Sequence, residues 1–180
     1  MSQDYTQKID SIITAMTQGD DASKLQANID AAELPADAVE QLAMIYNGED
    51  RVRSKTAGEM LKMMTHHAAR PGAKSEARKI TGQLAKLTGN QSPKSMRILA
   101  LDMLGYVGGP EAIPVLSRQL SDPDVQDQAR MALERIPSSA ALTALRKAKS
   151  AVPADYRESI DLSLKHREQT FKSIGTDIGK

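Results

Sequence analysis

Three prolines recur at a fixed interval in the second half of the chain, and they limit the folds open to it. Pro93, Pro123 and Pro153 follow one another at intervals of 30 residues, and each precedes a stretch with helical spacing of its apolar residues. Proline is tolerated at the first turn of a helix, because its missing N–H would have no partner there. The interval therefore predicts helices that stop and restart with a fixed period, as in a repeat protein.

Side chains inside these helical stretches repeat as well. Met96, Arg97, Ala100 and Leu104 recur as Val125, Gln126, Ala129 and Leu133, and then as Tyr156, Arg157, Ile160 and Leu164. One helix pair cannot bury its apolar faces alone, so such pairs stack and share a core. No stretch alternates with the period of a strand. We therefore predict an all-α fold, a right-handed α-solenoid of stacked helix pairs with about nine or ten helices.

The sequence EAIPVLSRQLSDPDVQDQARMALERI, Glu111–Ile136, resembles a HEAT-like repeat of the short kind found in phycobilisome-lyase proteins. The resemblance depends on Ala112, Ile113, Pro114, Val115, Leu116, Asp122, Pro123, Val125, Ala129 and Leu133. Gln126 departs from the pattern, because such repeats favour an arginine there that joins an Asp–Arg ladder. The resemblance implies HEAT-like repeats over 48–172. It does not extend to 1–47, where we predict N-terminal acidic helices that pack on the repeats. We expect a flexible tail over 173–180.

Composition narrows the class of protein. Aromatic residues make up 3% of the chain and there is no Trp, so the core has to be built from Leu, Ile, Val, Met and Ala. The chain has no Cys, which excludes disulfides and thiolate chemistry. No segment approaches the ~20 apolar residues of a membrane span. We expect a cytoplasmic protein that makes no use of a membrane.

The segment GEMLKMMTHHAAR, 58–70, contains side chains that could bind a soft metal. Met60, Met63, Met64, His66 and His67 include ligands suited to Cu(I). Adjacent histidines on a helix point about 100° apart, however, and the methionines have the spacing of a core face. The sequence has no Gly-x-Ser-x-Gly motif and no glycine-rich phosphate loop. We therefore predict no metal site, no cofactor and no catalytic residues.

Basic residues are concentrated in the second quarter of the chain. Residues 1–50 hold two Lys and ten acidic residues, whereas 51–100 hold eleven Lys and Arg and two acidic residues. On a helix over 50–69, one stripe within about 60° holds Arg51, Lys55, Lys62 and His66. A helix over 74–88 adds further cations. We therefore predict a basic ridge for partner binding, formed by Arg51, Lys55, Lys62, Lys74, Arg78, Lys79 and Lys86.

The ridge is open to several interpretations. It could be a solvated face that is partly neutralised by the acidic N-terminal helices, or by those of a second copy. It could also bind an acidic protein, or nucleic acid by contacts to the backbone alone, although it has no aromatic side chains for base stacking. We expect a non-catalytic protein–protein interaction or scaffold module. The alternatives are a non-sequence-specific nucleic-acid binder and a lyase- or glycosylase-like enzyme on the same scaffold.

Overall fold

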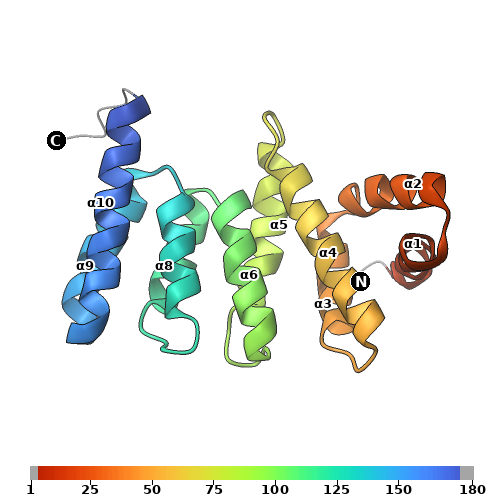
Figure 1. Cartoon of the computed structure of the whole chain (residues 1–180), viewed down its shortest axis with the longest axis horizontal. Helices are drawn as coiled ribbons and strands as arrows, with labels where there is room; N and C mark the ends of the chain where they lie inside the picture. Colours follow the sequence, from red (N-terminus) through yellow and green to blue (C-terminus); the bar gives the residue numbers. More distant parts are fainter. Residues whose placement is uncertain (1–3, 175–180) are drawn as a thin grey trace.

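The structure, a computed structural model, describes residues 4–174, and side chains over 4–170. Within that range it contains ten α-helices, three short 3₁₀ helices and no strand (Figure 1). The elements are α1 (Thr6–Gln18), α2 (Asp21–Ala32), η1 (Ala36–Ala38), α3 (Val39–Tyr46), α4 (Arg51–Ala68), α5 (Lys74–Lys86), α6 (Lys94–Val107), η2 (Pro110–Ala112), α7 (Ile113–Gln119), α8 (Gln126–Arg135), α9 (Ser139–Ala151), η3 (Ala154–Tyr156) and α10 (Arg157–Ile174).

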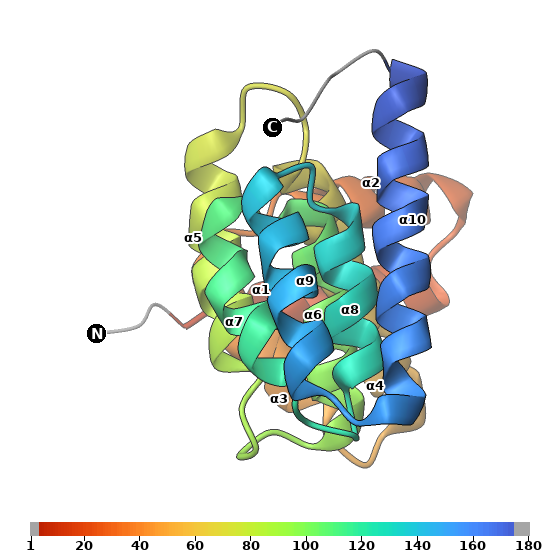
Figure 2. The ribbon, with the colours of Figure 1, turned by 90° about the vertical axis from the view of Figure 1, so that its left-hand side faces the viewer.

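From α3 onward the helices pack in pairs, α3 with α4, α5 with α6, α7 with α8 and α9 with α10. The pairs stand side by side along the long axis of the molecule (Figure 1). Figure 2 looks along this stack: α5, α7 and α9 form a first layer, and α6, α8 and α10 form a second layer. By their pairing, α3 belongs to the first layer and α4 to the second. The prediction of an all-α solenoid of stacked helix pairs is confirmed.

The two N-terminal helices do not continue the two layers. Both α1 and α2 pack against α4, and α2 runs across the end of the stack (Figure 1). Of α2, only Ala27 and Ala31 are buried, whereas Leu25 and Ile29 are exposed. This end of the solenoid is therefore covered by a helix that keeps its larger apolar side chains in solvent.

Side-chain caps fix the starts of three helices. Asp20 accepts a hydrogen bond from the Ser23 N–H at 2.8 Å at the start of α2. Asp50 accepts from the N–H groups of Val52 and Arg53 at the start of α4, at 3.0 and 3.1 Å. Caps of this kind satisfy N–H groups that have no partner within the helix. Ser138 does the same for α9.

The recurring prolines stand just before the helices and not inside their first turns. Pro93 and Pro153 have extended backbones, with ψ of 149° and 154°, and the helices begin at the next residue. Pro123 lies in a turn that precedes α8 by three residues, where Asp122 accepts a hydrogen bond from the Asp124 N–H. The helical stretch before Pro123 is divided into η2 and α7.

A single apolar core runs through the stack and is built from Leu, Ile, Met, Val and Ala. Among its buried side chains in the repeats are Leu101, Leu104, Ile113, Leu116, Leu120, Ala129, Leu133, Leu142 and Leu145. Ile98 of α6 is only partly buried and packs against this core.

The sequence predicted boundaries after residue 47 and after residue 172. In the structure α4, the first helix after the predicted acidic segment, begins at Arg51, and α10 continues to Ile174. The rest of the predicted tail, 175–180, lies outside the described residues. In the described part of the chain, no helix is both long and apolar enough to cross a membrane.

Candidate functional site

The cations of α4 lie on one exposed side of that helix. Arg51, Lys55 and Lys62 are exposed, and none of them forms an ion pair with a described residue. Glu59 is also exposed, one turn from both lysines, so a carboxylate stands within the basic stripe. The buried side of the same helix carries Met60 and Met64.

The cations of α5 belong to the other layer. Lys74, Arg78, Lys79 and Lys86 are exposed, as the sequence predicted. The Nε atom of Arg78 lies 3.8 Å from Oε1 of Glu111. Lys86 donates a hydrogen bond to Gln83 at 2.9 Å. Because α4 lies in the second layer and α5 in the first (Figure 2), the seven predicted residues form two groups, one of three and one of four.

The acidic N-terminal helices contact the basic segment through other side chains. Asp10 of α1 forms an ion pair with Arg53 of α4. Gln83 of α5 donates a hydrogen bond to Asp37 at 3.3 Å. Arg53 and Gln83 are not among the seven residues of the predicted ridge. Packing of α1 and α2 on α4 therefore leaves the exposed cations of α4 uncovered.

The methionines and histidines of 58–70 separate in the structure. Met60 and Met64 are fully buried in the core. His66 is exposed and its ring lies 5.3 Å from the Tyr106 ring, centroid to centroid. Nε2 of His67 lies 4.0 Å from Oε1 of Glu76. Among the described residues, no three His, Asp or Glu side chains are grouped so that they could hold a metal ion.

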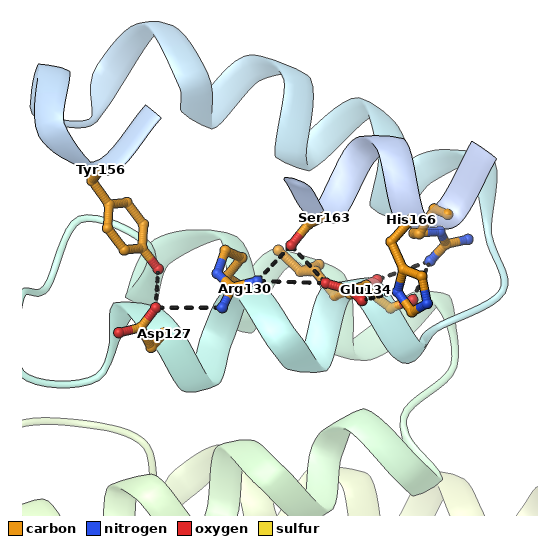
Figure 3. A network of polar contacts seen from close by, with 8 residues as sticks. Asp127, Arg130, Glu134, Tyr156, Ser163 and His166 are labelled. Carbon is orange, nitrogen blue, oxygen red and sulfur yellow. Dashed lines mark hydrogen bonds and ion pairs between the residues drawn. The ribbon is translucent and has the colours of Figure 1, made fainter. Parts of the chain in front are cut away.

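A polar network that the sequence did not predict joins α8 to α10 (Figure 3). At its centre Glu134 accepts a hydrogen bond from Ser163 at 2.6 Å and contacts Nδ1 of His166. Arg130 donates to the Ser163 hydroxyl at 2.6 Å. Burial alone would raise the pKa of Glu134, but the hydrogen bonds from Ser163 and His166 and the charges of His166 and Arg130 outweigh it, so the pKa is lowered.

The order of contacts in this network does not activate a nucleophile. In a Ser–His–acid triad the histidine stands beside the serine hydroxyl, and the acid lies on the far side of the ring. Here Ser163 and His166 both contact the acid, and Ser163 is only 1% exposed. The network therefore connects two repeats and does not present a reactive hydroxyl to solvent.

Tyr156 forms the other end of the network (Figure 3). Its hydroxyl donates a hydrogen bond to Asp127 at 2.9 Å. Burial, and then the hydrogen bond to this carboxylate, raise the pKa of Tyr156 to about 12. A phenol with so high a pKa stays protonated near neutral pH, so Tyr156 is a structural donor and not a general base.

The comparisons with known proteins identify the repeats. Residues 82–165 match the family model described as HEAT repeats, so the resemblance to HEAT-like repeats is confirmed. The matched region covers α6 to α9 and parts of α5 and α10. A comparison with curated proteins gave no match.

Proposed function

We propose that this protein is a non-catalytic scaffold that binds an acidic segment of a partner protein through the exposed cations of α4. HEAT repeats in general mediate protein interactions. The observation that carries the finer proposal is the group Arg51, Lys55 and Lys62, exposed on one helix without an ion pair to a described residue. Complementary charge steers association and selects partners, even where each exposed contact contributes little.

The charges around this surface favour a protein partner over nucleic acid. Binding to a phosphate backbone gains affinity with each phosphate that a cation neutralises. Glu59 lies among the cations of α4 and would repel a phosphate chain, whereas a protein segment can place a neutral or basic side chain opposite it. The α5 group, Lys74, Arg78, Lys79 and Lys86, forms a second basic surface that the same experiment tests.

Two charge reversals of equal size separate the surfaces. One variant carries Lys55→Glu with Lys62→Glu, and the matched control carries Lys79→Glu with Lys86→Glu. Each variant and the wild type are used to capture proteins from a nuclease-treated lysate. We expect the α4 variant to fail to bind proteins that the wild type captures, and the α5 variant to bind them still. Both should keep the thermal midpoint, because exposed charges contribute about 0–1 kcal/mol each.

Each other outcome has a definite meaning. If only the α5 variant failed to capture the partner proteins, the binding surface would be assigned to the first layer. Capture that is unchanged in the α4 variant would contradict the proposal. Capture that disappears on nuclease treatment of the wild-type sample would assign the surface to nucleic acid.

A further inference from the structure

Tyr106, in the last turn of α6, is half exposed and yet contacted by side chains of two neighbouring helices. The His66 ring of α4 lies 5.3 Å from its ring, with the planes tilted by 60°. The guanidinium carbon of Arg135, on α8, lies 4.6 Å from the Tyr106 ring centroid. Arg135 also donates a hydrogen bond at 2.6 Å to Asp102, one turn before Tyr106 on α6. Side chains from three neighbouring helices of the second layer therefore meet at one exposed aromatic ring.

The burial of apolar surface does not account for this arrangement, because half of Tyr106 remains in solvent. Exposed large apolar side chains occur on each helix of the second layer: Val52, Tyr106, Met131 and Leu162. Met131 lies one turn before Arg135 on α8 and is 40% exposed. Tyr, Met and Arg are the residue types enriched at protein interfaces. We define Tyr106, Met131 and Arg135 as the anchor patch.

We infer that the anchor patch binds an apolar side chain within an acidic segment of a partner protein. This inference rests on the proposed function, since Lys62 stands one turn before His66 on the neighbouring α4 and supplies the charge that selects an acidic segment. A ring fixed by His66 and Arg135 loses little conformational freedom on binding. Fixed aromatic and arginine side chains at the centre of a surface are the usual hot spots of binding energy.

The same geometry disfavours a nucleotide base as the occupant. A base needs a free face of the ring for stacking. The guanidinium of Arg135 lies over one face of Tyr106, which leaves only the other face for stacking. Asp102, one turn before Tyr106 on α6 and paired with Arg135, adds a carboxylate on the same helix that would repel a phosphate.

Two synthetic peptides test the inference, each of alternating Glu and Ser, one with a central Leu and one with Ser in its place. Fluorescence anisotropy should show that wild type binds the Leu peptide about tenfold more tightly than the Ser peptide. Tyr106→Ala and, separately, Met131→Ser should remove most of this preference. Met131→Ser leaves the contacts of Tyr106 with His66 and Arg135 intact, so it checks the patch without disturbing the ring. Leu162→Ala, at an exposed apolar residue of α10, is the matched control and should keep the preference.

Equal binding of the two peptides to wild type would overturn the inference, as would a preference that survives both Tyr106→Ala and Met131→Ser. If binding to either peptide still fell with Lys55→Glu and Lys62→Glu, the proposed function would stand without the anchor patch. A single-stranded oligothymidylate that bound more tightly than the Leu peptide, and was lost in Tyr106→Ala, would instead assign the patch to nucleotide bases.

Discussion

Arg97 of α6 is a buried cation that joins one repeat to the next. Its guanidinium donates hydrogen bonds to the carbonyl of Thr88 and to Gln119, both at 3.2 Å, and forms an ion pair with Asp122. In the next repeat the equivalent position is Gln126, and Val152 stands where Asp122 does. Both members of the pair are replaced together, so neither is left as an unpaired buried charge.

We predict that Arg97→Met lowers the free energy of unfolding by about 2–4 kcal/mol. The substitution leaves the Thr88 carbonyl without its donor and Asp122 without its cation, and breaking a buried pair costs more than losing an exposed one. Chemical denaturation measures the change. The control is Lys94→Ala, which removes the exposed Lys94–Asp124 pair of 2.8 Å and should cost less than about 1 kcal/mol. Equal effects of the two substitutions would show that Arg97 is not a structural cation.

The same ion pair predicts a dependence of stability on pH. The hydrogen bond from Arg97 holds the pKa of Asp122 below its usual range, against the opposing effect of burial. A carboxyl group with a lowered pKa in the folded state stabilises the protein above its unfolded pKa of about 3.9, and that stabilisation is lost as the pH falls through the folded value. The difference in unfolding free energy between wild type and Asp122→Asn should therefore shrink below pH ~4. A difference that stayed constant from neutral to acidic pH would contradict this.

For individual residues, the sequence predicted more of the core than of the polar contacts. Residues such as Leu133 repeat with a fixed period and are buried as expected. The contacts of Tyr106 with His66 and of Arg135 with Asp102 connect helices of different repeats. Their residue types do not recur from repeat to repeat, so periodicity gave no signal for them.

The elements α6 and α8 approach closely at Gly105. A Cβ atom at Gly105 would lie 2.9 Å from the Cα of Ala132, which is backbone and cannot rotate away. Gly82 of α5 is the opposite case, because a Cβ atom there would meet nothing within 4 Å. Close helix packing therefore requires a glycine at 105 but not at 82.

We predict opposite effects of alanine at these two glycines. Gly82→Ala should stabilise the protein by roughly 0.5–1 kcal/mol, the difference in helix propensity at an open site. Gly105→Ala should destabilise it by about 1–3 kcal/mol, because overpacking outweighs the same propensity gain. Thermal unfolding of both variants measures this, and stabilisation by Gly105→Ala would show that the two helices have room to separate.

Helical spacing predicted which side of α4 and of α5 is exposed, but it does not compare one helix with another. The predicted ridge combined cations of consecutive helices, and the structure places α4 and α5 in different layers (Figure 2). The repeat pattern could have predicted that these two helices lie in different layers. In a stack of helix pairs, consecutive helices alternate between the two layers, so cations on α4 and α5 belong to different layers.

At the scale of the whole molecule, charge is distributed unevenly along the solenoid. The acidic segment 1–50 forms one end of the molecule, where α1 and α2 pack on α4 and Asp10 pairs with Arg53. The adjacent cations of α4 remain exposed beside the anchor patch, which lies on the same layer. We therefore expect the second layer, from α4 to α8, to be the binding surface.

Site-specific crosslinking tests this claim most directly. A photoreactive benzoylphenylalanine replaces the exposed Glu59 on α4 in one variant, which keeps the cations of that helix, and Lys79 on α5 in the other, and each is irradiated with the Leu peptide. We predict a crosslinked product from position 59 and little or none from position 79. A product from position 79 alone, or equal yields from both, would contradict the assignment of binding to the second layer.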